Sequence, residues 1–187
     1  MKIYLVIIGA VFILSFSCCC NRQSEKMIKE WVGKEIILDD AVYTIEGYDT
    51  IDYSLDAYEY KVLNYVDSEG CTDCKMKLEE WKDYIAHVDS LYPGKVGFVF
   101  CFATNNLRTI RFLLSERNFK HPVYIDTSNI FCRKNDIPNN YMLQTFLLNR
   151  DNRVIAIGNP IVNSRIKKLY NQVFSLDNLS EYKIPIY

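Results

Sequence analysis

The chain has 187 residues, 49% of them hydrophobic, which fits one globular domain with its own core. Lysine and arginine number 22 against 23 aspartates and glutamates, so the formal net charge is −1. A chain without a basic excess gives no electrostatic reason to bind nucleic acid, and we exclude nucleic acid as a partner.

The first segment is predicted to be an export signal. One lysine precedes an apolar run at residues 3–16, which is too short to cross a bilayer core of roughly 30 Å but has the length of a signal-peptide core. The following Ser17-Cys18 resembles the lipobox of bacterial lipoproteins, in which the cysteine is lipidated and becomes the new N-terminus. The resemblance implies a signal peptide at 1–17, a lipid on Cys18 and a membrane tether at 18–31.

Three alternatives stay open for this segment. Cys19 or Cys20 is the lipid acceptor, or the signal is cleaved without lipidation, or it remains as a short anchor. In each case the domain at residues 32–187 is exported, and its thiols meet oxidising conditions.

After the tether, the predicted elements follow one another closely. Short β-prone pieces at residues 35–38 and 42–48 predict an N-terminal hairpin or edge extension. A compact apolar strand at 60–66 then leads into a polar turn and the cysteine pair of Cys71 and Cys74. From the pair onward, apolar residues recur at helical spacing, which predicts a helix with one buried face (Cys74, Leu78, Trp81, Ile85, Val88).

The rest of the chain alternates strands and helices. Strands are predicted at 96–103, 122–126, 145–148 and 154–157, and helices at 105–118, 130–135 and 162–174. Consecutive strands joined by helices pair in parallel through right-handed crossovers, and the last two strands form an antiparallel hairpin. We therefore predict a three-layer α/β domain with a mixed central sheet.

The cysteine pair has the spacing of a redox dithiol. At a strand-to-helix junction, the first cysteine lies at the helix N-terminus, where backbone N–H groups and the helix dipole favour a thiolate. Cys71 is thus the predicted nucleophile. Cys74 follows one turn later on the buried face, as the thiol that resolves a mixed disulfide. The acidic neighbours Asp67, Glu69 and Asp73 oppose the thiolate, while Lys75 favours it.

Two other uses of the pair stay open, an inert structural disulfide and half of a zinc site. Zinc needs further ligands, and the candidates are Cys101, Cys132, His87 and His121. Cys101 lies in an apolar strand and is interpreted as a small buried hydrophobe, Cys132 as a half-buried spare thiol, and the histidines as ordinary packing or surface residues. We predict no metal and no cofactor.

The order of these elements resembles the thioredoxin fold. The helix and strand at residues 105–126 resemble the insert of TlpA-like and ResA-like thiol-disulfide oxidoreductases, and the likeness covers residues 35–175. Members of that family are membrane-tethered proteins of the bacterial envelope. The resemblance implies a thioredoxin-like fold and a disulfide oxidoreductase activity.

The sequence departs from that family at two places. Gly70 precedes the first cysteine, where the family has tryptophan. The family's cis-proline, which faces the cysteine pair, aligns with Leu143, because Pro138 lies five residues too early. The resemblance therefore implies a substrate groove at Leu143, Gln144 and Thr145, with a trans peptide bond at Leu143 and weak general reductase activity.

These observations predict a lipid-anchored oxidoreductase that reduces or isomerises disulfides of envelope proteins and faces the periplasm or the outside. Its partners are disulfide-bearing envelope proteins, the membrane and an upstream electron donor. The alternative is a redox-inactive binding or scaffold lipoprotein with the same fold. Fourteen tyrosines also permit an aromatic binding face, although tyrosine is an ordinary strand residue, and we favour packing.

Overall fold

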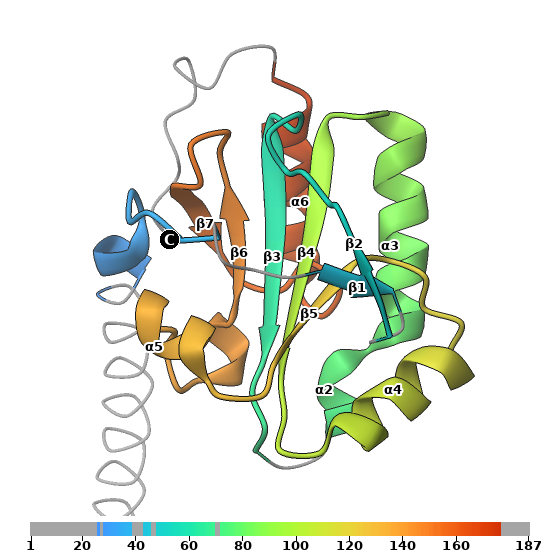
Figure 1. Ribbon diagram of the computed structural model, residues 1–187. Coiled ribbons are helices and arrows are strands. Elements are labelled where there is room, and N and C mark those ends of the chain that lie inside the picture. Colours follow the sequence, from blue (N-terminus) through green and yellow to red (C-terminus); the bar gives the residue numbers. More distant parts are fainter. Residues whose placement is uncertain (1–25, 27, 39–42, 46–47, 70–71, 177–187) are drawn as a thin grey trace, which may run out of the picture.

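The computed structural model describes residues 26, 28–38, 43–45, 48–69 and 72–176. These residues form a seven-stranded mixed sheet in the order β2-β1-β5-β4-β3-β6-β7 (Figure 1). Its centre is parallel: β3 (Tyr60–Val66) pairs with β4 (Val96–Ala103), and β4 pairs with β5 (Val123–Asp126). The hairpin of β6 (Thr145–Leu148) and β7 (Val154–Ile157) extends the sheet antiparallel to β3. The predicted fold class is confirmed.

Most helices also lie where the pattern predicts them. They are α3 (Leu78–Leu91), α4 (Leu107–Glu116), α5 (Ile130–Asn135) and α6 (Ser164–Phe174). None of the helices in the described ranges is both long enough and apolar enough to cross a membrane. The predicted signal peptide and Cys18 lie outside the described residues.

The prediction for the N-terminal strands was wrong in detail. Residues 35–38 form no strand, and only an isolated bridge joins Glu35 to Arg153. The hairpin lies further along the chain and is formed by β1 (Tyr43–Ile45) and β2 (Asp49–Ile51). The strand β1 also pairs antiparallel with β5. Lys34 and Ile36 form backbone hydrogen bonds with Val154 of β7 and with Asn152 in the turn before it, and the next N–H, of Ile37, donates to the Asn135 side chain of α5. The pairing with β7 is therefore limited to one bridge, and the segment forms no strand.

The helix after the cysteine pair is interrupted, which the periodicity did not predict. A short helix, α2 (Thr72–Met76), ends at Lys77, whose left-handed backbone (φ 47°, ψ 47°) separates it from α3. The break shifts the helical phase, so Met76 is buried and Cys74 is exposed. The prediction that Cys74 shares the buried face of α3 was therefore wrong, whereas Leu78 and Trp81 are buried as predicted.

Each face of the sheet has its own hydrophobic core. On one face, α3, α4 and α6 pack on alternate residues of β3 and β4, among them Val62 and Phe100. On the other, α5 and the N-terminal segment pack on the intervening residues, among them Leu63 and Cys101 (Figure 1). Trp31, at the end of the predicted tether, is buried in this second core with its ring 5.0 Å from that of Phe146.

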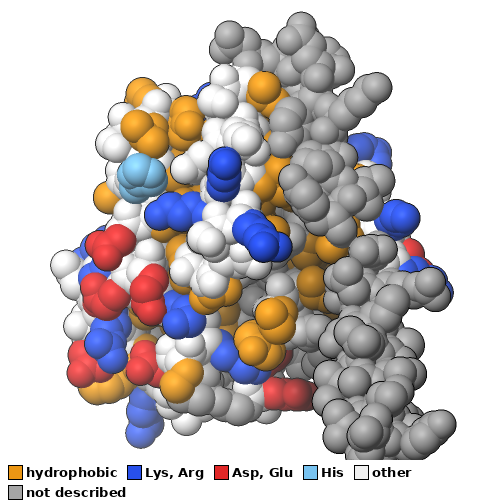
Figure 2. All heavy atoms as spheres, turned by 180° about the vertical axis from the view of Figure 1, so that it is seen from behind, with side chains coloured by type: hydrophobic (Ala, Val, Ile, Leu, Met, Phe, Trp, Pro, Cys, Tyr) orange, Lys and Arg blue, Asp and Glu red, His pale blue; other side chains and the backbone are white. Residues whose placement is uncertain are grey.

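Charged side chains of both signs cover the helical face. Figure 2 shows acidic side chains among lysines and arginines toward the lower left of this face and only basic side chains over its middle, and α6 carries three basic residues and no acidic one. Several pairs are ion pairs, such as Lys82 with Glu79 at 2.8 Å. This distribution agrees with the balanced composition.

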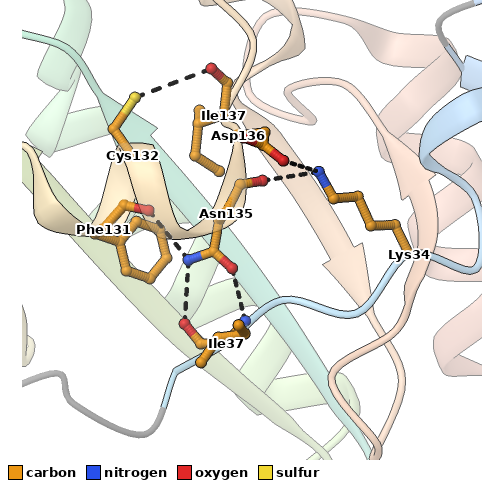
Figure 3. Close-up of polar contacts among 7 residues, drawn as sticks. All are labelled: Lys34, Ile37, Phe131, Cys132, Asn135, Asp136 and Ile137. Carbon is orange, nitrogen blue, oxygen red and sulfur yellow. Dashed lines mark hydrogen bonds and ion pairs between the residues drawn. The ribbon is translucent and has the colours of Figure 1, made fainter.

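One buried amide holds the N-terminal segment against α5. Asn135 is 2% exposed, and its Oδ1 accepts the Ile37 N–H at 2.7 Å while its Nδ2 donates to the Ile37 carbonyl oxygen at 3.1 Å. The same Nδ2 donates to the Phe131 carbonyl oxygen, and Lys34 Nζ donates to the Asn135 carbonyl oxygen (Figure 3). Asn135 thus satisfies both backbone groups of Ile37.

We expect Asn135→Ala to lower the free energy of unfolding by about 1–3 kcal/mol, because it leaves the backbone N–H and C=O of Ile37 without their partner. Urea denaturation at neutral pH measures the change. Arg133→Ala, at an exposed position of the same helix, is the control and should change stability by less than about 0.5 kcal/mol. Equal effects of the two substitutions would contradict the role assigned to Asn135.

Candidate functional site beside the cysteine pair

Cys74 belongs to α2, which follows the central strand β3 in the chain and lies toward the end of the sheet at which β3 ends (Figure 1). It is disulfide-bonded, whereas Cys101 and Cys132 are free. Its side chain is exposed rather than packed under α3. Cys71, the predicted nucleophile, lies outside the described residues, as does Gly70.

A cavity of about 730 Å³ opens beside Cys74. Five parts of the chain line it: Ile28, the end of β3 from Asn64 to Val66, the residues Cys74, Lys75 and Lys77 in and directly after α2, residues 140–144, and residues 157–166 in part. Leu143 and Gln144 therefore line the same cavity as Cys74. Thr145 is buried in β6, where its hydroxyl donates to Asn64 Oδ1 at 3.0 Å.

A polar chain connects this wall to α2. Gln144 is buried, and its Nε2 donates to Asp67 Oδ2 at 3.1 Å and to the Pro138 carbonyl oxygen at 3.0 Å. Lys75 Nζ donates to the other oxygen of Asp67. Burial alone raises the pKa of Asp67, but the hydrogen bonds from Lys75 and Gln144 and one from the Glu69 N–H outweigh it, so the pKa is lowered.

The lowered pKa of Asp67 predicts a specific loss of stability in acid. Because the folded-state pKa lies below the unfolded one, the stabilisation is present above the unfolded pKa of about 4 and is lost as pH falls through the folded pKa. We expect Asp67→Asn to reduce the difference in unfolding free energy between neutral and acid pH, as measured by urea denaturation. A difference as large as in the wild type would show that Asp67 contributes nothing to acid sensitivity.

The segment before β6 is a short 3₁₀ helix, η1 (Tyr141–Leu143). The Leu143 N–H, which a proline would lack, donates to the Asn140 carbonyl oxygen at 2.8 Å. The Asn140 side chain accepts from the Met142 N–H. None of the described peptide bonds is cis, in agreement with the expectation for Leu143.

Two of the three acidic neighbours of the pair, Asp67 and Asp73, have basic partners. Asp73, between the two cysteines in sequence, forms an ion pair of 3.4 Å with Arg117 at the end of α4. Asp67 is paired with Lys75, as described above. Their opposition to a thiolate is therefore smaller than the sequence alone implied.

The other cysteines and histidines lie apart from this pocket. Cys101 is completely buried in β4, where burial raises the pKa of its thiol well above the ordinary value, and Cys132 is half-buried, with Sγ 3.9 Å from the Ile137 carbonyl oxygen. His87 is exposed on α3, and the His121 ring packs at a tilt against Phe119, with the ring centroids 5.2 Å apart. Among the described residues, no three metal-binding side chains form a group that holds a metal ion.

Sequence reasoning missed several residues of the cavity. Ile28 lies in the predicted tether, Asn64 in an apolar strand, and Val162 at the entry to α6, yet all three line the cavity with Cys74. Their separation along the chain left no local pattern to link them. The one available signal was Tyr141-Met142, an apolar pair between polar residues that matches no helix or strand face.

No protein-family model matches the sequence, and no curated protein does. Solved structures are similar in fold. A protein of Chlorobium tepidum assigned as thiol:disulfide interchange protein DsbE has a TM-score of 0.57 at 11% identity, over 77% of this chain and 98% of that one. A cysteine variant of PrxQ from Xylella fastidiosa has a TM-score of 0.54 at 12% identity, over 76% and 94%. The thioredoxin domain of a thiol-disulfide oxidoreductase from Bacteroides vulgatus has a TM-score of 0.53 at 8% identity, over 73% and 96%.

These similarities establish a thioredoxin-like fold, the fold that the order of elements predicted. At such low identity they concern the fold alone. In all, the described residues combine this fold with a disulfide-bonded Cys74 at the edge of a large cavity.

Proposed function

We propose that the chain is a thiol-disulfide oxidoreductase of the TlpA-like and ResA-like kind, anchored in the bacterial cell envelope, and that it exchanges disulfides through Cys71 and Cys74. One observation carries the proposal: Cys74 is disulfide-bonded, exposed and in the wall of a cavity large enough for a segment of a peptide. The thioredoxin-like fold supports it by analogy.

The proposed chemistry is thiol–disulfide exchange with the reduced protein as the reductant. The Cys71 thiolate attacks one sulfur of a client disulfide, the client S–S bond breaks, and the other client sulfur leaves as a thiolate that takes a proton. Cys74 then loses its proton and attacks Cys71. The Cys71–Cys74 bond forms, and the second client sulfur leaves. The client gains two electrons and an upstream donor must return two to the protein.

The short length of α2 limits how strongly the helix acidifies Cys71. Five residues give a weak dipole, and Lys77 breaks the helix before α3. The ion pairs of Asp67 with Lys75 and of Asp73 with Arg117 act in the other direction, because they offset the negative charge near the pair. We expect a thiolate pKa that is lowered only modestly.

Alkylation of the reduced protein tests this proposal. A reagent such as iodoacetamide, applied over a range of pH, should modify Cys71 with a midpoint below that of a free thiol, near 8.5. Since Cys74 is exposed, it should react too, but with a midpoint closer to a free thiol. Equal, slow modification of both would favour the rival function, a scaffold lipoprotein with an inert disulfide. Stoichiometric zinc in the native protein would favour a metal site.

Attachment to the membrane is a separate part of the proposal, and it rests on the signal-like segment and Ser17-Cys18. Metabolic labelling with a fatty acid should mark the wild type and not Cys18→Ala. Label that persists in Cys18→Ala but disappears in Cys19→Ala would move the acceptor by one residue. Label that depends on none of the cysteines from 18 to 20 would contradict lipidation.

A further inference from the structure

We propose that the cavity beside Cys74 selects its clients by side chains: it accepts an apolar residue next to the reacting cysteine and favours an acidic residue close by. This inference rests on the proposed function and concerns the class of peptide that the site takes. Three features of the cavity carry it: backbone groups that are already bonded, an exposed apolar wall, and a lining whose charged residues are all basic.

The backbone N–H groups of residues 142–144, which line the cavity with Cys74, are already hydrogen-bonded. The N–H groups of Met142, Leu143 and Gln144 all donate within η1, to Asn140 or Tyr141. The Gln144 carbonyl oxygen accepts the Tyr65 N–H at 2.9 Å. A client that added a strand here would have to displace these bonds, so main-chain pairing contributes little. Selectivity must then come from side chains.

The wall of the cavity offers apolar surface to such side chains. Tyr141, Met142 and Val162 are 64%, 61% and 57% exposed, and all three line the cavity. Large hydrophobic side chains that cluster at this exposure mark binding surfaces, and the flexible methionine adapts to different shapes. The volume of about 730 Å³ lies within the range of pockets that enclose small ligands.

The charged residues of the lining give the preference for an acid. Among the described residues that line the cavity, the charged ones are Lys75 and Lys77, and none is acidic. Lys75 is held by Asp67. Lys77 pairs with Glu80 at 3.3 Å, and both side chains are exposed, so this ion pair is weak and an incoming carboxylate competes with it. Lys77 is therefore the group that meets the acidic residue.

An unpaired amide adds a point of contact in the cavity. Asn64 is 3% exposed, and its Nδ2 has no hydrogen-bond partner among the described residues, while its Oδ1 is fixed by Thr145. A buried donor without an acceptor is unfavourable, and an acceptor on a bound peptide would remove that cost. The apolar wall, Lys77 and the Asn64 amide together form a site that fits a peptide.

The test uses short peptides of equal length, each with one cysteine as a mixed disulfide with methanethiol. Their cysteine is flanked by Leu and Glu, by Leu and Lys, or by Ser and Glu. We expect the reduced full-length protein to react with the Leu–Glu peptide about fivefold faster than with the Leu–Lys peptide, and up to about tenfold faster than with the Ser–Glu peptide. High salt should reduce the ratio of the Leu–Glu rate to the Leu–Lys rate, and it should leave the ratio of the Leu–Glu rate to the Ser–Glu rate unchanged.

Two variants show which residues give these ratios. Lys77→Glu should reverse the preference between the Glu and Lys peptides, and Met142→Ser should reduce the preference for Leu over Ser. Arg150→Glu, which changes the charge equally in the β6–β7 turn outside the lining, should alter neither ratio. Equal rates with all three peptides would overturn this inference and leave the proposed function standing. No reaction with any peptide beyond that of Cys71→Ser would instead overturn the proposed function.

Discussion

Cys71→Ser is expected to lower the rate of disulfide exchange on the order of 10³-fold or more, the scale of loss when an enzyme lacks the group that attacks its substrate. A serine hydroxyl stays protonated at neutral pH and forms no disulfide, so the first step cannot occur. Cys74→Ser keeps the attacking thiol and loses the thiol that resolves the intermediate. Turnover stops after one event, and the client remains bound through a mixed disulfide.

A reduced, affinity-tagged protein added to an envelope extract provides the measurement. Cys74→Ser should carry clients that a reductant releases, and neither Cys71→Ser nor the double variant should carry them. Because Cys74 is exposed, the opposite result is informative: clients trapped by Cys71→Ser and not by Cys74→Ser would reverse the two roles. Full activity of both single variants in insulin reduction would contradict the dithiol mechanism.

The sheet was predictable because burial on both faces leaves strands almost continuously apolar. The sequence of β4 is VGFVFCFA, all eight residues are buried, and β3 is buried throughout as well. Helices α4, α5 and α6 were predicted within two residues at each end because one apolar stripe faces the sheet. For these elements, the pattern of apolar residues in the sequence is enough to predict where each strand and helix lies.

The break between α2 and α3 was not predictable by the same argument. Lysine is a good helix former, and nothing in its own chemistry marks Lys77 for a left-handed backbone. The apolar spacing from Cys74 to Leu78 fits an unbroken helix as well. Burial of Met76 in the core accompanies the break, and this depends on tertiary packing. As a result, the predicted environment of Cys74 was wrong, although the cysteine itself was identified.

Half of the candidate site follows from the sequence. Leu143 and Gln144, which line the cavity together with Cys74, were singled out by the order of elements before β6, which pairs with β3. The cavity itself did not follow, because its other walls come from Ile28 and from residues 157–166, which only the fold brings together. No periodic pattern of apolar and polar residues in the sequence indicates that these distant segments line one cavity.

Trp81→Ala is expected to lower the free energy of unfolding by about 3–5 kcal/mol, a large part of the roughly 5–15 kcal/mol that stabilises a domain. Trp81 is completely buried between α3 and the sheet, with its ring 5.3 Å from that of Phe100 and 5.9 Å from that of Tyr84. Its removal leaves a cavity that the surrounding strands cannot close. Urea denaturation monitored by circular dichroism measures the change.

Trp81→Phe separates the loss of packing from the loss of the indole N–H. The indole nitrogen is buried and has no hydrogen-bond partner among the described residues, so phenylalanine removes an unsatisfied donor while it keeps an aromatic ring against Phe100. We therefore expect Trp81→Phe to cost less than half as much as Trp81→Ala. His87→Ala, at an exposed position of α3, should cost less than about 0.5 kcal/mol. If Trp81→Ala were no more destabilising than His87→Ala, the result would contradict the described packing of α3 against β4. It would also contradict the position of α2 and Cys74 at the end of the sheet.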